Sequence, residues 1–222
     1  MKKQFLVLGL GKFGKSVLKE LSTLGHEVVG CDKDPKILED NELRKYADHL
    51  VEGDAASNNV LEELDATQYD AVIVSMGDDF ESAILIVLAL KEMGCQHIYA
   101  KANDAKRGTG LQKAGASKVI FPEEETGKRA AHYIANPQLL HYVQLTEHFS
   151  TIELPIPLSF VGQSLLELNF RKNYNALVIM IRKEYEKKPI ISPNPLYEFQ
   201  PGDSIFVLGE DKDLERLRKR FE

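Results

Sequence analysis

Cysteines and long apolar runs are both scarce in this chain of 222 residues. Its two cysteines, Cys31 and Cys95, form no CxxC pair, so we expect them to stay reduced in the cytoplasm. The longest apolar run, Ala83–Leu90, has eight residues, whereas a helix needs about 20 to cross a bilayer. A strand-like run starts directly after the N-terminal lysines, without the pattern of a signal peptide. These features predict a cytoplasmic protein that does not itself span a membrane.

An excess of positive charge is also missing, because the formal net charge is −6. This balance argues against a nucleic-acid partner, whose phosphates attract basic domains. The basic cluster between Arg216 and Arg220 could be a nucleic-acid or lipid patch, but we interpret it as the solvated end of a helix whose first turn is acidic. With 43% hydrophobic and 28% charged residues, the chain can form a globular core in one or two domains.

Several catalytic signatures are absent from the sequence. None of the eight tyrosines has a lysine four residues later, so the Tyr-x-x-x-Lys pair of short-chain dehydrogenases is missing. The sequence has no GxxxxGK[ST] phosphate loop and no GxSxG nucleophile elbow. Its six histidines lack the spacing of metal ligands. These absences indicate that the protein is not an enzyme.

The first part of the chain alternates short β-type runs with amphipathic helical stretches. The predicted strands are Gln4–Gly9, Glu27–Asp32, His49–Glu52, Ala71–Ser75, His97–Lys101 and Lys118–Phe121. The predicted helices are Phe13–Leu24, Pro35–Tyr46, Asn58–Leu64, Asp79–Met93 and Asp104–Ala114. This alternation predicts an α/β domain, a Rossmann-like, doubly wound parallel sheet with helices on both faces. The fifth helix is the weakest prediction, because it contains Gly108 and Gly110.

Residues 122–147 interrupt this alternation of strands and helices, and we expect them to form a crossover helix and a dimerisation segment. A helix begins at Pro122, with three glutamates in its first turn, and Leu139–Val143 is predicted to be a second, short helix. From residue 148 a small α+β domain follows. Its predicted strands are Phe149–Ile156, Ala176–Arg182, Pro189–Ser192 and Ser204–Leu208, and its predicted helices are Ser164–Leu168 and Asp211–Phe221. The predicted domains are therefore residues 1–121 and 148–222, joined by 122–147.

The strongest chemical motif is the string GLGKFG at Gly9–Gly14. It follows a predicted strand, opens a predicted helix, and has Asp32 at the end of the second strand. In this pattern the first glycine permits a tight turn, Gly11 lets a diphosphate approach the backbone, and the third lets the helix lie close to the strand. Asp32 would accept hydrogen bonds from ribose hydroxyls and repel a 2′-phosphate, which argues against NADP. The motif therefore predicts a nucleotide-binding site that includes the amides of Lys12 and Phe13.

Residues after the other strands extend this candidate site. Lys33 follows Asp32, Gly53-Asp54-Ala55 follow the third strand, Ser75-Met76-Gly77 follow the fourth, and Lys101 ends the fifth. Taken singly, each is ordinary turn chemistry. Because the carboxyl ends of parallel strands share one edge of the sheet, we expect these residues to surround a purine and its phosphates. A nucleotide site without catalytic side chains indicates a sensor.

Several segments together resemble the RCK (regulator of potassium conductance) family. In the first domain they are Phe5–Gly14, Gly53–Ala55, Lys113–Ala116 with Val119-Ile120, and Pro122-Glu123; in the second they are Gly162–Leu165, Leu168–Arg171, Tyr174, Pro201–Asp203 and Ile205–Gly209. The resemblance covers essentially the whole chain and includes an RCK N domain followed by an RCK C (TrkA-C) domain. It is similar to the cytosolic regulatory subunits of Ktr/Trk potassium uptake systems.

The resemblance implies an assembly and a ligand. Such subunits form homodimers through the helix after Pro122, and the dimers assemble into octameric rings that dock on a membrane potassium-translocating subunit. ATP or ADP in the N-terminal crevice switches the ring, and some members bind NAD(H). The family pattern implies that Glu123 reaches the nucleotide phosphates or an associated divalent cation such as Mg²⁺. Lys12 stands where the Ktr type usually has arginine, and it lacks the bidentate fork of that side chain.

The resemblance also implies a ligand for the second domain. In Gram-positive members the C-terminal domains pair around cyclic di-AMP, which inhibits uptake. The positions here that match this pocket are Leu165, Leu166, Arg171, Tyr174 and Pro193. An arginine for phosphate and apolar side chains for adenine suit such a ligand. The alternative interpretation of these residues is a plain dimerisation core.

These features favour a nucleotide-gated regulatory ring over two alternative functions. A soluble NAD-dependent oxidoreductase of unknown substrate would need a proton donor near the nicotinamide, for which the sequence offers no candidate. A DNA-binding redox repressor would need a helix-turn-helix motif and a basic patch, and the sequence shows neither.

Overall fold

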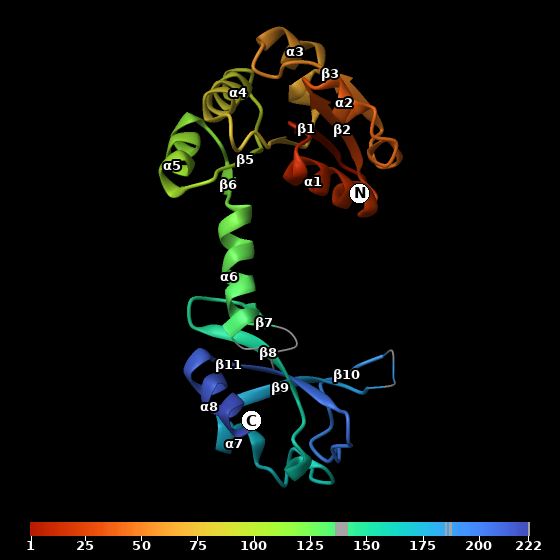
Figure 1. The fold of residues 1–222 in the computed structure, drawn as a ribbon, viewed down its shortest axis with the longest axis vertical. Helices are drawn as coiled ribbons and strands as arrows, with labels where there is room; N and C mark the ends of the chain where they lie inside the picture. Colours follow the sequence, from red (N-terminus) through yellow and green to blue (C-terminus); the bar gives the residue numbers. More distant parts are fainter. Residues whose placement is uncertain (136–141, 185, 187, 222) are drawn as a thin grey trace. The chain divides into compact units, whose positions relative to one another are not determined.

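The computed structural model describes residues 1–135, 142–184, 186 and 188–221, which fall into two units, Met1–Glu125 and Thr126–Glu222 (Figure 1). Among the described residues of the first unit, six parallel strands form one sheet in the order β3-β2-β1-β4-β5-β6. The strands are β1 (Gln4–Leu8), β2 (Glu27–Asp32), β3 (His49–Glu52), β4 (Ala71–Val74), β5 (Ile98–Lys101) and β6 (Lys118–Ile120). The strand order reverses between β1 and β4, because the chain first adds strands on one side of β1 and then on the other. Doubly wound sheets bind their ligands at this point. The predicted Rossmann-like fold is confirmed.

Helices cover both faces of this sheet, because side chains alternate along the central strand β1. Leu6 and Leu8 join one apolar cluster, whereas Val7 joins the other. The cluster with Leu6 also holds buried residues of α3, α4 and α5, and the cluster with Val7 holds buried residues of α1 and α2. The helices are α1 (Lys12–Thr23), α2 (Pro35–Leu38), α3 (Asn58–Glu63), α4 (Phe80–Glu92) and α5 (Ala105–Ala114), with the 3₁₀ turns η1 (Leu43–Lys45) and η2 (Ala66–Gln68).

The predicted helix Pro35–Tyr46 is wrong in its second half. Helix α2 ends at Leu38, and the chain resumes as the 3₁₀ turn η1. The cause is Asp40, whose Oδ1 accepts hydrogen bonds from the amides of Glu42 and Leu43 at 3.0 and 3.2 Å. A side chain that bonds the following amides offers the backbone an alternative to the helix. Its other oxygen pairs with Lys15 Nζ of α1 at 2.9 Å, and this contact lowers the pKa of Asp40.

Helix α5 forms despite its two glycines, because packing requires one of them. A β-carbon added to Gly108 would lie 2.5 Å from Cζ of Phe121, so only glycine lets the helix lie this close to the residue that follows β6. The side chain of Asp104 supplies the N-cap by accepting a hydrogen bond from the amide of Arg107 at 2.8 Å. Tertiary packing therefore outweighs the low helix propensity of glycine here.

The second unit is built on an antiparallel sheet. In its described part, five strands lie in the order β10-β9-β11-β8-β7. They are β7 (Tyr142–Gln144), β8 (Phe149–Pro155), β9 (Ala176–Arg182), β10 (Ile190–Ile191) and β11 (Ser204–Glu210). The 3₁₀ turn η3 (Leu158–Phe160) and the helices α7 (Phe170–Tyr174) and α8 (Asp211–Phe221) complete the unit. The predicted small α+β domain, with its β9–β10 hairpin, is confirmed.

Two predicted helices near this unit are corrected. Of the expected helix Leu139–Val143, Leu139–His141 lie outside the described residues, and Tyr142 and Val143 belong to strand β7. They pair with β8, which gives their backbone groups a sheet ladder in place of helical hydrogen bonds. The expected helix Ser164–Leu168 is a turn, held by the hydrogen bond from the amide of Ser164 to the carboxylate of Glu167 at 2.8 Å.

The turn cannot extend into a regular helix, because Asn169 adopts a left-handed conformation with φ of 44°. The helix of this region is α7, which starts one residue later at Phe170. Helix α6 (Pro122–Ala135) begins in the first unit and ends in the second, as the run of glutamates after Pro122 predicts. Among the described residues, no helix combines the length and the apolarity that a membrane span requires.

We expect Gly108→Ala to destabilise the first unit by about 1–3 kcal/mol, because the methyl group would overpack the contact with Phe121. Gly127→Ala in α6 is the matched control, since nothing lies within 4 Å of its β-carbon position. The control should gain up to about 1 kcal/mol from helix propensity. Denaturant unfolding of both variants measures the difference, and a Gly108→Ala variant as stable as wild type contradicts this account of α5.

Candidate functional site

The turn between β1 and α1 forms the centre of the predicted site. Gly9 has φ of +87°, and its amide donates a hydrogen bond to the carbonyl of Cys31 at 2.9 Å. A β-carbon on Gly14 would lie only 2.0 Å from the carbonyl oxygen of Gly9, so α1 packs directly onto the turn. Nothing lies within 4 Å of the β-carbon position of Gly11. The turn is thus closed on its inner side and open at Gly11, the geometry that a phosphate-binding turn requires.

The N-terminus of α1 is available for an anion. Gly11 is the N-cap residue, and among the described residues no side chain caps this helix. The first amides of a helix have no partner within the helix, so those of Lys12 and Phe13 can donate to a ligand. They also lie at the positive end of the helix dipole. Lys12 is exposed and Phe13 is half-buried at this end.

Asp32 lies at the end of β2, beside the glycine turn. Its Oδ2 accepts a hydrogen bond from the amide of Leu10 at 2.6 Å, and its Oδ1 accepts one from the amide of Asp34 at 2.9 Å. These two bonds fix the carboxylate next to the turn in which the phosphates would lie. The structure therefore brings Asp32 and Gly9–Gly14 together, and it leaves the neighbouring Lys33 exposed.

The loop after β3 supports the site and adds few exposed side chains to it. The amide of Gly53 donates to the carbonyl of Asp32 at 3.0 Å, which ties this loop to the end of β2. Asp54 Oδ1 accepts a hydrogen bond from the amide of Ala56 at 3.0 Å, so its carboxylate stabilises its own turn. Ala55 is buried in the core. The three residues stand at the expected edge of the sheet, with mainly structural contacts.

The loop after β4 is locked to the glycine turn. The buried hydroxyl of Ser75 donates to the carbonyl oxygen of Gly9 at 2.6 Å. Met76 lies close to the same glycine, since a β-carbon there would be 3.1 Å from its Cγ. The contact joins β1 and β4 across the point where the strand order reverses.

Lys101 and Glu123 form an ion pair at the same edge, with Nζ and Oε1 2.7 Å apart. The lysine side chain is 12% exposed and the glutamate 64%. The hydrogen bond from Lys101 lowers the pKa of Glu123 from its ordinary value. Lys101 also lies against the loop after β4, because a β-carbon on Gly77 would be 2.8 Å from its Cε. The lysine thus connects the carboxyl edge of the sheet with the first turn of α6.

Sequence reasoning missed two polar residues at this edge. Asn103 Nδ2 donates to Asp78 Oδ1 at 3.1 Å, which joins the loops after β5 and β4. The guanidinium of Arg107 lies 3.4 Å from the carbonyl of Gly77 and 5.6 Å from the centre of the Phe80 ring. Asp104 is the N-cap of α5, so Arg107 stands in the first turn of that helix. An N-cap residue followed three positions later by arginine is the sequence signal that would have indicated a second cation at this edge.

Among the described residues, no group of three or more His, Cys, Asp or Glu side chains could hold a metal ion. These residues therefore do not support a metal site formed by the protein alone. Glu123 offers one carboxylate, already paired with Lys101. A divalent cation at Glu123 would therefore take its other ligands from nucleotide phosphates and water.

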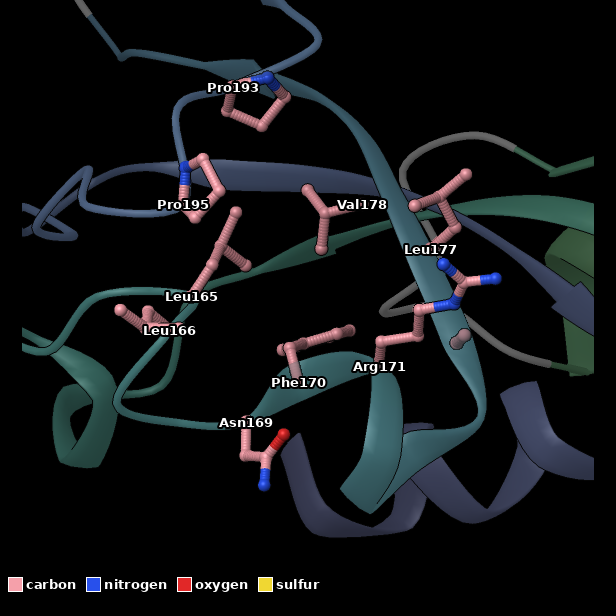
Figure 2. A pocket seen from close by; sticks show the side chains of 10 residues that line it. Leu165, Leu166, Asn169, Phe170, Arg171, Leu177, Val178, Pro193 and Pro195 are labelled. Carbon is pink, nitrogen blue, oxygen red and sulfur yellow. The ribbon is translucent and has the colours of Figure 1, made fainter.

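A hollow of about 260 Å³ in the second unit contains four of the five residues proposed for cyclic di-AMP. Figure 2 shows Arg171 and Leu177 on one side of it and Pro193 and Pro195 on the other. Its lining residues are Leu165, Leu166, Asn169, Phe170, Arg171, Ala176, Leu177, Val178, Pro193 and Pro195. The hollow is mainly apolar, and Arg171 supplies its positive charge.

Tyr174 is the fifth of these residues, and it does not line the hollow. Its ring packs against Phe170 at 4.8 Å and against Phe160 at 6.2 Å between ring centres. On another side the guanidinium of Arg220 lies 5.6 Å from the ring centre. Tyr174 therefore belongs to the packing between α7 and α8.

Comparisons with known proteins agree with this two-part architecture. The family model of the TrkA-N domain matches residues 5–122, and that of the TrkA-C domain matches residues 150–222. The chain is 36% identical to Ktr system potassium uptake protein C of Bacillus subtilis, over 99% of this chain and 98% of the relative. It is 32% identical to Ktr system potassium uptake protein A of the same organism, over 97% and 95%. The chain belongs to this TrkA-N/TrkA-C family. The resemblance inferred from the glycine string and the second-domain segments is thus confirmed.

Solved structures share the fold of this family. The GsuK channel bound to NAD has a TM-score of 0.56 and 19% identity, over 99% of this chain and 38% of that one. The GsuK structure bound to ADP has a TM-score of 0.52 and 18% identity, over 62% of this chain and 36% of that one. The chain thus spans well under half the length of these solved proteins, and the likeness shows the fold alone.

We expect Gly14→Ala to destabilise the first unit by about 3 kcal/mol or more, because the methyl group would collide with the carbonyl oxygen of Gly9. Gly11→Ala is the matched control in the same turn. It has open space for a β-carbon and φ of −64°, so we expect a cost below about 1 kcal/mol. Thermal unfolding measures both, and equal stability of the two variants contradicts the close approach of α1.

Proposed function

We propose that the chain is a nucleotide-sensing regulatory subunit of a potassium uptake system and has no enzymatic role. Family membership and the names of the Ktr relatives support the potassium uptake system. One observation carries nucleotide binding: the open backbone at Gly11 lies beside the fixed carboxylate of Asp32, at the point where the strand order reverses. Amides for phosphates and a carboxylate for ribose are the two contacts by which such folds hold nucleotides.

The proposed ligand is ATP or ADP, with NAD(H) as a further nucleotide of the same site. The α1 amides at Lys12 and Phe13 would bind phosphates, and Asp32 would bind ribose hydroxyls. Lys101 is a cation within reach of the loop after β4 and would bind the terminal phosphates. The GsuK structures support this choice, because they share the fold and were solved bound to NAD and to ADP.

The ion pair between Lys101 and Glu123 gives nucleotide binding a path to α6. A phosphate that bonds Lys101 would compete with the carboxylate of Glu123, which stands in the first turn of that helix. A divalent cation such as Mg²⁺ between the phosphates and Glu123 would reverse this competition and hold the glutamate at the ligand. A ligand shifts a conformational equilibrium only by its difference in affinity for the two states, and this contact provides such a difference.

The subunit is proposed to act in an assembly. Homodimers formed through α6 would build an octameric ring, which would dock on the membrane potassium-translocating subunit at the cytoplasmic face. Lys12 would lie at the nucleotide phosphates, where its ammonium group retains charge but not the planar fork of arginine. The domains proposed for this assembly are residues 1–121 and 148–222, with 122–147 as the dimerisation segment.

The second domain is proposed to bind cyclic di-AMP, as an inhibitor of uptake, in the hollow around Arg171. The apolar walls at Leu165, Leu166 and Pro193 would contact the adenines, and the guanidinium would pair with a phosphate. Leu166 is 62% exposed and Leu177 is 50% exposed. Exposed apolar side chains around the opening suit a ligand shared between two copies of this domain.

We expect ATP and ADP to raise the melting temperature of the full chain, and Asp32→Ala to remove most of that shift, because the ribose loses its acceptor. Asp70→Ala is the matched control. Its carboxylate also accepts a hydrogen bond from a backbone amide, that of Gln4 at 2.8 Å, but at the opposite edge of the sheet. Thermal shift with ATP, ADP and NADH measures these effects. Stabilisation by NADH alone, with a monomeric mass by light scattering, would favour the oxidoreductase and contradict the proposal.

Cyclic di-AMP should bind the wild-type chain, and Arg171→Ala should weaken binding at least about tenfold through loss of a charge-assisted hydrogen bond. Arg218→Ala on α8 is the control, because Arg218 does not line the hollow. Isothermal titration provides the affinities. If cyclic di-AMP does not bind, or binds both variants equally well, the hollow is a plain dimerisation surface.

A further inference from the structure

A second hollow of the second unit, of about 400 Å³, lies where α7 and α8 meet. Four basic side chains and one carboxylate are among the residues that line it: Lys172, Asn173, Tyr174, Asn175, Asp213, Arg216, Leu217, Lys219 and Arg220. Its charge is therefore opposite to the net charge of the chain, which is −6. The volume lies within the range of small-molecule sites, roughly 300–1,000 Å³.

The walls of this hollow are held in place by side-chain contacts between α7 and α8. The ring of Tyr174 packs on Phe170, and the guanidinium of Arg220 lies over this ring, 5.6 Å from its centre, in a cation–π contact. Asn175 Nδ2 donates to Asp213 Oδ2 at 2.6 Å and thereby ties the end of α7 to the first turn of α8. The basic side chains thus come from two helices whose relative position is fixed.

The cations of the hollow exceed its acids. Arg216 pairs with the buried Asp213 at 3.4 Å, and Lys219 pairs with Glu215 at 3.1 Å. Among the ion pairs of the described residues, none involves Lys172 or Arg220. Exposed pairs such as the one at Lys219 contribute little energy, so that lysine can exchange its partner for a ligand. Like charges gathered around one hollow repel each other unless an anion neutralises them.

We propose that this hollow is a binding site for a small anion that carries two or more phosphate groups. The site differs from the glycine turn, which belongs to the other unit, and from the apolar hollow at Leu165, which has Arg171 as its cation. Lys172 of α7 and Arg220 of α8 both line the hollow and would bind separate phosphates, and Lys219 would add a third donor. In this structure three residues of the basic cluster at Arg216–Arg220 line one cavity, and Arg218 does not.

Inorganic pyrophosphate is the probe, and isothermal titration of the full chain is the measurement. Because pyrophosphate also suits the glycine turn, the result is the difference between wild type and a Lys172→Ala/Arg220→Ala variant. We expect the variant to lose one class of sites, with affinity there reduced at least tenfold, and the wild-type affinity to fall with added salt. Arg218→Ala, on the same helix but outside the hollow, should behave as wild type.

Lys172→Ala/Lys219→Ala keeps the contact of Arg220 with Tyr174 and guards against misfolding as the cause of any loss. It should weaken binding in the same direction. The ATP-dependent rise in melting temperature should persist in all of these variants, which separates this site from the nucleotide site of the first unit. Identical pyrophosphate isotherms for wild type and both double variants, or an equal loss in Arg218→Ala, overturn the proposal.

Discussion

The close approach of α1 to the turn after β1 is the constraint on which the first unit depends. A β-carbon on Gly14 would lie 2.0 Å from the carbonyl oxygen of Gly9 and 2.6 Å from the hydroxyl of Ser75. The same hydroxyl donates to that carbonyl at 2.6 Å, so one small volume joins β1, α1 and the end of β4. This contact places the N-terminus of α1 beside the turn, and the proposed phosphate site depends on it.

Charge at this edge is divided in a way that suits a nucleotide. The carboxylate of Asp32 stands on the β2 side, and the cations Lys101 and Arg107 stand on the β5 and α5 side. A ribose and its phosphates would therefore lie across the sheet between groups of the matching sign. Glu123 is the link to the rest of the molecule, since it pairs with Lys101 and stands in the helix that leaves the unit.

Sequence reasoning predicted the parts of this fold that depend on local pattern. The turn was predicted from the spacing of its three glycines and from the position of Asp32, because each glycine is required for a different steric reason. Propensity made α5 the weakest of the predicted helices, but the helix forms, and the ring of Phe121 requires Gly108 in it. Along α2, Asp40 hydrogen-bonds the amides that follow it, and no periodicity of apolar residues reveals such a bond.

The second unit was harder to predict, because its contacts join residues far apart in the sequence. Ile205 pairs with Leu154, and Asn175 bonds Asp213 across the two helices. The left-handed Asn169 just before α7 sets where this helix begins, and no apolar periodicity reveals that conformation. For the same reason the basic residues of α8 were interpreted as a solvated helix end, although they meet Lys172 around one hollow.

The central claim is that a nucleotide at the glycine turn controls potassium uptake. It is tested most directly by potassium flux into proteoliposomes that carry the membrane potassium-translocating subunit, with this chain added under ATP or under ADP. The account predicts a flux that depends on the chain, differs severalfold between the two nucleotides, and loses that difference in Asp32→Ala. Equal flux with ATP, with ADP and without the chain would contradict it.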